Sequence, residues 1–152
     1  RLGRSNVPDL FDADYKFEIG KAVTVAEGTD VTIIATGIMV AEAKAAAEEL
    51  SKEGISAGVL NIHTIKPIDS EAIIKAAEKT GCIVTCEEHS IIGGLGSAVA
   101  EVLVENNPVP MLRLGVNDTF GESGKPNDLL KKYKLKSSDI VEKVKAVLAK
   151  KK

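Results

Sequence analysis

The chain has 152 residues, of which 44% are hydrophobic and 28% charged, and its formal net charge at pH 7 is −2. This length suits one ordinary domain with a substantial core. The slightly acidic balance and an aromatic content of 3% give no electrostatic or stacking basis for binding nucleic acid. No apolar run reaches the roughly 20 residues that a membrane helix needs, so we expect no membrane partner.

Hydrophobic periodicity predicts strands and helices that alternate along the chain. Residues 1–16 are irregular and rich in turn formers, and residues 17–25 favour a short hairpin or an edge strand. The β-branched run at 31–36 predicts a strand buried on both faces. An amphipathic helix follows it, and the same alternation continues, with helices expected at 39–53, 70–80, from about 97, at 127–133 and at 138–150, and strands at 57–62, 82–86 and 110–114.

This order predicts the fold class. Alternating strands and helices favour an α/β domain of three layers, with a mostly parallel, mixed sheet of about five strands and helices on both faces. We expect one such domain at 17–152, preceded by a connecting segment at 1–16.

The two cysteines help to place the protein in the cell. Cys82 and Cys86 lie four residues apart around one predicted strand, so their side chains would stand about 13 Å apart. That separation is too large for a disulfide within the chain, and we expect two reduced, buried thiols in a cytoplasmic protein. The sequence has no second cysteine pair and no histidine spacing that would favour a metal site.

A polar cluster and a glycine turn separate the strand at 82–86 from the helix that follows. Gly94, Leu95 and Gly96 form a partial dinucleotide fingerprint, but Val99 stands where the third small residue belongs. Close packing of the helix against the strand explains these glycines equally well. A small anion at the helix N-terminus fits the pattern better than a dinucleotide does.

The polar cluster itself leaves two interpretations open. Glu87, Glu88 and His89 could supply acid–base chemistry, or they could be polar residues that end a strand. Because adjacent strand residues point in opposite directions, at most one or two of them can face one site. His63, at the start of a loop, is open to the same two interpretations.

Several segments, in this order and spacing, resemble the C-terminal domain of the transketolase superfamily. The resemblance rests on residues 87–99, on Ala-Thr-Gly at 35–37, and on Thr-Phe-Gly-Glu-Ser-Gly at 119–124. Residues 3–6 resemble the end of the family's pyrimidine-binding domain. Residues 61–69 look more like 2-oxo-acid dehydrogenase β subunits and deoxyxylulose-phosphate synthase. The segment at 119–124 favours transketolase itself.

The resemblance implies thiamine diphosphate and magnesium chemistry, in which a two-carbon ketol unit moves between sugar phosphates. It also implies that the cofactor lies between other domains, so this domain alone neither binds thiamine diphosphate or magnesium nor reacts. The implied partners are the other transketolase domains or an N-terminal subunit, together with homodimer contacts and a sugar phosphate substrate. Residues 1–16 would then be the linker from a pyrimidine-binding domain.

The resemblance also implies a set of site residues. Arg4 matches the family arginine that meets the phosphate of the sugar substrate, a task that suits a bidentate guanidinium. Arg1 stands where the related synthase has an arginine, and we expect it to assist. His89 and Glu88 are candidates for a residue that faces the substrate channel or a subunit interface. The resemblance assigns no catalytic residue and no metal ligand to this domain.

Two alternatives remain open at this point. The chain could be the C-terminal domain of a 1-deoxyxylulose-5-phosphate synthase or of a 2-oxo-acid dehydrogenase β subunit. It could instead be a stand-alone assembly module that binds an anion or a nucleotide at the glycine turn.

Overall fold

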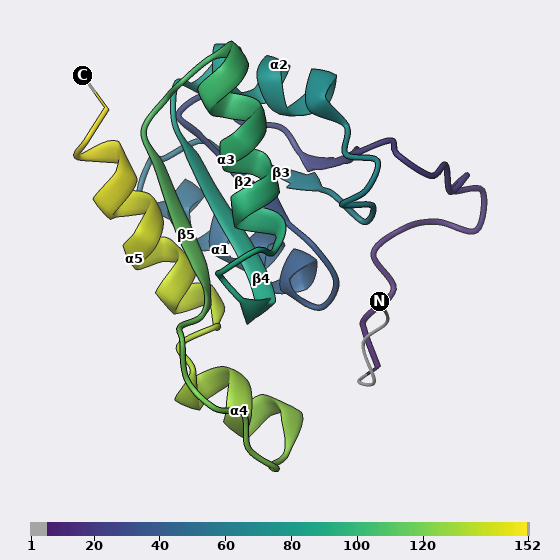
Figure 1. The fold of residues 1–152 in the computed structure, drawn as a ribbon. Helices are drawn as coiled ribbons and strands as arrows, with labels where there is room; N and C mark the ends of the chain where they lie inside the picture. Colours follow the sequence, from purple (N-terminus) through teal and green to yellow (C-terminus); the bar gives the residue numbers. More distant parts are fainter. Residues whose placement is uncertain (1–5, 152) are drawn as a thin grey trace.

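The computed structural model describes residues 6–151, which form one sheet covered by helices (Figure 1). The five strands lie in the order β1-β3-β2-β4-β5. In chain order the elements are β1 (Val23–Ala26), β2 (Val31–Ala35), α1 (Met39–Lys52), β3 (Ala57–Asn61), α2 (Ser70–Thr80), β4 (Ile83–Ser90), α3 (Leu95–Asn106), β5 (Met111–Val116), α4 (Pro126–Lys132) and α5 (Ser137–Leu148).

The sheet is mixed but mostly parallel, which confirms the predicted fold class. Strands β3, β2, β4 and β5 pair in parallel, and β1 adds to the edge of β3 in the antiparallel sense. β1 is the edge strand that the region 17–25 predicted, and it begins only at Val23. Its last pairs are shifted in register by a bulge between Thr24 and Ala26.

Helices cover both faces of the sheet. Successive residues of a strand point to opposite faces, so a strand buried on both sides contributes to two separate core clusters. Ile33 of β2 belongs to one core cluster, with residues of α1 and α5. Its neighbour Ile34 belongs to a second cluster, with residues of α2 and α3. Both side chains are fully buried. None of the helices within residues 6–151 is both long and apolar enough to cross a membrane.

The predicted boundaries around the glycine turn were wrong in two respects. The structure continues β4 through the polar cluster to Ser90, and α3 begins at Leu95, two residues earlier than expected. Ser90 pairs with Val116 of β5 beyond a register shift, and Ile91 N donates to Val116 O at 3.0 Å. Glu87, the first charged residue of this strand, is buried and has hydrogen-bond partners at the start of α3.

The strand order creates a switch point between β2 and β4. The chain leaves β2 through α1 towards β3, and it leaves β4 through α3 in the opposite direction, towards β5. The two helices lie on opposite faces of the sheet (Figure 1). In open α/β sheets, the crevice at the carboxyl end of such a strand pair is the usual ligand position.

Candidate functional site

A polar cavity of about 360 Å³ lies at this switch point, at the carboxyl ends of β2, β3 and β4. We call it the edge pocket. Every loop that follows these three strands contributes to it. Its walls are Thr36 and Gly37 after β2, residues 63–66 after β3, residues 87–89 of β4, and Gly93 and Gly94 before α3.

Glu87 closes the floor of the edge pocket by binding the start of α3. Its side chain is only 1% exposed. Oε2 accepts a hydrogen bond from Leu95 N at 2.8 Å, and Oε1 accepts one from Gly96 N at 2.9 Å. These amides are among the N–H groups that a helix leaves without partners in its first turn, and a carboxylate beside them also complements the helix dipole. The protein thus supplies its own anion to α3.

This contact corrects the expectation of a small anion at the glycine turn. The two amide groups that an incoming anion would use already bind the Glu87 carboxylate. The glycine pattern also has a structural cause, because a Cβ on Gly94 would lie 1.9 Å from Glu87 Oε2. Gly94 therefore makes room for the carboxylate, and the close-packing interpretation of the glycines is the one that holds at this position.

The loop between β4 and α3 is also held in place from β5. Arg113 donates from Nη1 to the Ile91 carbonyl at 2.8 Å and to Ser97 Oγ at 3.3 Å. Ser97 Oγ in turn accepts from Gly93 N at 3.0 Å. These contacts fix one wall of the edge pocket, and neither Arg113 nor Ser97 was singled out for this role from the sequence.

Glu88 and His89, the two candidates for a channel or interface, both line the edge pocket. Their side chains are 25% and 31% exposed, and His89 Nε2 lies 4.0 Å from Glu88 Oε1. Gly37 faces them across the pocket. It adopts φ +58°, and a Cβ there would lie 3.8 Å from Glu88 Oε1. The structure therefore brings all three residues 87–89 to one cavity, whereas strand alternation alone predicted one or two.

His63 stands at the opposite wall of the edge pocket and is held by its neighbours. Its Nδ1 shares a hydrogen bond of 2.9 Å with Thr64 Oγ1, and its ring lies against Phe17 with the ring centres 4.4 Å apart. Its Nε2 is buried and has no hydrogen-bond partner among the described residues. His63 and Lys66 add basic groups to a pocket that also holds the carboxylate of Glu88.

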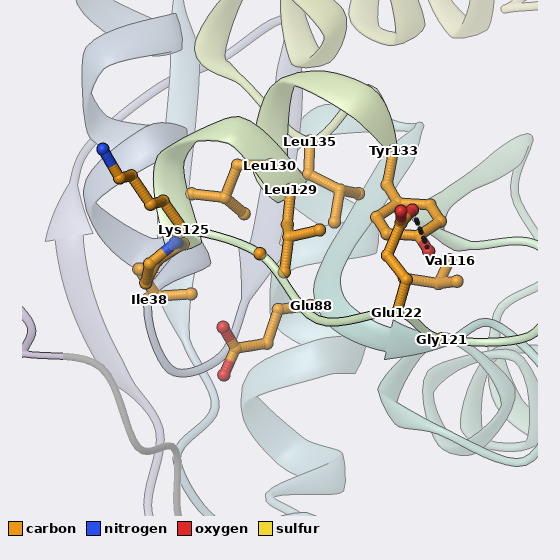
Figure 2. A pocket seen from close by; sticks show the side chains of 12 residues that line it. Ile38, Glu88, Val116, Gly121, Glu122, Lys125, Leu129, Leu130, Tyr133 and Leu135 are labelled. Carbon is orange, nitrogen blue, oxygen red and sulfur yellow. Dashed lines mark hydrogen bonds between the residues drawn. The ribbon is translucent and has the colours of Figure 1, made fainter.

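An apolar groove of about 760 Å³ meets the edge pocket at Glu88, which lines both. Figure 2 shows Leu129, Leu130 and Leu135 converging on the groove, while the carboxylate of Glu88 points away from them. Tyr133 closes one end, where its hydroxyl donates to Glu122 Oε1 at 3.0 Å (Figure 2). The groove is therefore bordered by α4, by the loop that precedes it, and by the ends of β4 and β5.

Two of the predicted site residues, Arg1 and Arg4, lie outside the described residues, so their role stays a prediction. The described segment that follows them packs at the carboxyl edge of the sheet, where the edge pocket also lies. A cavity of about 360 Å³ is lined by Val7, Leu10 and Phe11 of this segment and by Asn61 and His63 at the end of β3.

The described residues do not fit a magnesium–diphosphate site. Between residues 6 and 151, no cluster of three or more His, Cys, Asp or Glu side chains is arranged to hold a metal ion. The helix amides that could cradle a diphosphate at the switch point bind Glu87 instead. No catalytic step is therefore assigned to this chain through thiamine diphosphate or its metal.

The fold and the edge pocket together define a doubly wound α/β domain with a polar site at its switch point. Residues 20–140 match the family described as the transketolase C-terminal domain, and the chain belongs to this family. This result confirms the resemblance on which the sequence interpretation rested.

Two curated relatives that are about half identical to this chain are transketolase subunits. The chain is 55% identical over 141 residues to a 6-deoxy-6-sulfo-D-fructose transketolase subunit of a Clostridium species, covering 93% of this chain and 44% of that protein. It is 47% identical over 141 residues to an apulose-4-phosphate transketolase subunit of Phocaeicola vulgatus, covering 92% of this chain and 45% of that protein. The chain thus spans less than half the length of these relatives.

A solved structure of a split-gene transketolase also has a very similar backbone fold. A split-gene transketolase, described as an inactive β4 tetramer, superposes with a TM-score of 0.94 at 52% identity. The match covers 98% of this chain and 49% of that one.

Proposed function

We propose that this chain is the C-terminal part of one of the two kinds of subunit in a split-gene transketolase, namely the one that carries the C-terminal half of the enzyme. Such an enzyme moves a two-carbon ketol unit between sugar phosphates. The observation that carries the proposal is the likeness over nearly the whole chain to a split-gene transketolase chain, with a TM-score of 0.94 and 52% identity. The names of the two curated relatives support the same assignment, since both are transketolase subunits.

In this proposal, thiamine diphosphate and magnesium are bound by other domains. The described residues lack a metal-binding cluster, and their switch-point helix carries its own carboxylate. The partners are the rest of the same subunit, which would include a pyrimidine-binding domain before residues 1–16, and an N-terminal subunit that holds the diphosphate. We expect the isolated chain, supplied with thiamine diphosphate and magnesium, to show no turnover of ketose phosphates.

The chain's own contribution to the reaction is to complete the substrate end of the site. Arg4, assisted by Arg1, binds the substrate phosphate, and an arginine fork suits two phosphate oxygens at once. Glu88 and His89 lie at the carboxyl edge of the sheet, where they face the substrate channel or the neighbouring subunit. The partly exposed positions of both side chains support a contact role.

A kinetic comparison in the complete enzyme tests this assignment. Arg4→Ala should raise KM for phosphorylated ketoses by about ten-fold or more, because it removes charge-assisted hydrogen bonds to phosphate. The affinity for thiamine diphosphate should not change. Lys44→Ala, at an exposed position on α1, is the matched control for loss of a positive charge. An unchanged KM in Arg4→Ala would contradict the assignment.

The choice of substrate separates transketolase from the related enzymes. The complete enzyme should use xylulose 5-phosphate with ribose 5-phosphate and should fail with pyruvate as donor. Turnover of pyruvate would favour a synthase or a 2-oxo-acid dehydrogenase instead.

A further inference from the structure

Asn61 is a buried polar side chain that neither the fold nor the proposed function uses. It is the last residue of β3 and only 6% exposed, and its Oδ1 has no hydrogen-bond partner among the described residues. A buried acceptor without a donor lowers stability, and folded proteins keep few of them. A ligand that supplies the missing donor is one reason to keep such a group.

Asn61 lines the cavity of about 360 Å³ that residues 7–15 wall on one side. We call residues 7–15 the strap and this space the strap cavity. His63 lines the same cavity, and its buried Nε2 also has no partner among the described residues. The other walls include the apolar side chains of Val7, Leu10, Phe11 and Val40. Mainly apolar walls with a few unpartnered polar groups are the usual form of a small-molecule site.

The strap is held over this cavity in a way that allows a ligand to enter. Between residues 6 and 151, no hydrogen bond or salt bridge joins it to another part of the chain, and its one internal backbone bond runs from Tyr15 N to Asp12 O at 3.0 Å. Leu10 packs against the larger core cluster. Figure 1 shows the strap outside the layers of sheet and helices. Such apolar contacts can separate and re-form without breaking any hydrogen bond to the rest of the described chain.

The charges around the strap cavity disfavour an anionic ligand. Asp9 and Asp12 are among its lining residues, and within residues 6–151 it is lined by no lysine or arginine. Phosphate or a further carboxylate would be repelled by these two side chains, most strongly at low ionic strength. The ligand is therefore neutral or cationic.

The hydrogen bonds that the cavity wall lacks specify a hydroxyl group. Asn61 Oδ1 needs a donor. His63 Nδ1 shares a hydrogen bond of 2.9 Å with Thr64 Oγ1 in which either atom can donate, so His63 Nε2 needs an acceptor in one tautomer and a donor in the other. A hydroxyl group meets both needs, whereas an ammonium group can only donate. We propose that the strap cavity binds a small neutral molecule with several hydroxyl groups, such as a polyol or an unphosphorylated sugar.

The size and the remaining walls of the cavity suit such a molecule. Its volume equals that of about twelve water molecules, so a polyol of about ten non-hydrogen atoms fits. Phe11 and Tyr15 stack with their ring centres 4.4 Å apart, and both rings line the cavity, where they offer apolar surface to the carbon chain. The strap's other backbone N–H and C=O groups have no partner within residues 6–151, so they can bind further hydroxyl groups.

This inference does not depend on the proposed function, because its test measures binding to this chain and needs no turnover. Titration of the ¹⁵N-labelled chain with ribitol should shift the side-chain amide signal of Asn61 and the backbone signals of the strap. The shifts should saturate, with a dissociation constant of about 1 mM or below. Amide hydrogen exchange in the strap should slow, because a bound ligand holds it in place. Inorganic phosphate and propylammonium should leave the Asn61 signal unchanged.

Asn61→Leu separates a ligand contact from a structural role. Leucine has a similar size but no polar atom, so the dissociation constant for ribitol should rise by about ten-fold or more. The same change removes a buried acceptor without a donor, so the Tm of the ligand-free chain should stay the same or rise. Asn106→Leu, at the exposed end of α3, is the matched control and should bind ribitol as the wild type does. Phe11→Ala, in the strap, should weaken binding by about five-fold.

Three results would overturn the proposal. The first is a wild-type chain whose Asn61 signal shows no saturable shift with ribitol. The second is an Asn61→Leu variant that binds ribitol as tightly as the wild type, or whose Tm without ligand falls, which would give Asn61 a structural role instead. The third is an Asn61 signal that responds to propylammonium or phosphate in place of ribitol, which would contradict the chemical class of the ligand.

Discussion

Glu87→Ala is the substitution that most directly tests how the edge pocket is built. It removes the carboxylate that accepts from Leu95 N at 2.8 Å and from Gly96 N at 2.9 Å, in a position only 1% exposed. Each buried N–H left without a partner costs about 1–3 kcal/mol, so the loss should be about 4 kcal/mol in total. That is a large part of the roughly 5–15 kcal/mol that stabilises an ordinary domain.

The measurement is the free energy of unfolding in urea, followed by circular dichroism. For a domain of this size, the loss corresponds to a fall in Tm of about 10 °C. Glu88→Gln, one residue along the same strand and 25% exposed, is the matched control and should change stability by less than about 0.5 kcal/mol. A loss as small as this in Glu87→Ala would refute the reasoning.

A second substitution shows whether the glycine turn and Glu87 act as one unit. Gly94→Ala places a Cβ 1.9 Å from Glu87 Oε2 and 2.9 Å from the Ser90 carbonyl, so it should displace the carboxylate. In the Glu87→Ala background the first clash is gone, and Gly94→Ala should cost less there than in the wild type. Strictly additive effects of the two changes would mean that the glycine serves another purpose.

Three further outcomes are expected. Asp69→Ala should lower stability by about 1–2 kcal/mol in urea unfolding, because Asp69 caps α2 by accepting from Ala72 N at 3.1 Å and also accepts from Ala22 N at 2.9 Å. Glu122 has a pKa lowered below its ordinary value of 4.5, chiefly by its hydrogen bond with Lys132. Its contribution is therefore present at neutral pH and lost as the pH falls through the folded-state pKa, so Glu122→Gln should match the wild-type Tm in acid but not at neutral pH. Burial raises the pKa of the Cys86 thiol, so iodoacetamide should modify Cys86 only after unfolding; rapid alkylation of the native chain, seen by mass spectrometry, would contradict its burial.

Periodicity was sufficient to predict most of the fold. The run at 31–36, which is β-branched except for Ala35, predicted a strand covered on both sides, and the structure buries every residue of β2. The helix at 70–80 was predicted with its observed bounds, since Asp69 and Gly81 mark its two ends chemically. Gly81 adopts φ +66°, the left-handed conformation that ends helices.

The edge pocket was less predictable, because its central contact joins residues through space. Polar residues often end a buried strand, and this was one of the two interpretations that the sequence left open for Glu87. Its actual partners, the amides of Leu95 and Gly96, become visible only once α3 is folded back against β4. The sequence did hold one signal, a carboxylate shortly before a glycine-rich helix start, where helix amides lack partners.

The edge pocket also depends on residues whose roles cannot be predicted from the sequence around them. Arg113 lies on a strand whose other residues are mostly apolar, and nothing in its neighbours indicates that it supports the loop of residues 91–97. Glu88 borders both the edge pocket and the apolar groove. This double position can be predicted only when the relative positions of α4 and β4 are known. Such contacts follow from tertiary packing and not from local sequence.

The carboxylate at the start of α3 shows how a fold so close to the dinucleotide-binding architecture can complete its switch point from within. A helix that begins at such a point presents a concentration of positive potential, and here a side chain of the same chain neutralises it. One acidic residue at the end of the preceding strand thus decides whether the amides at the start of such a helix are free to bind an anionic ligand. In related folds, the presence of a carboxylate at this position would identify helices whose first amides are already bound within the chain.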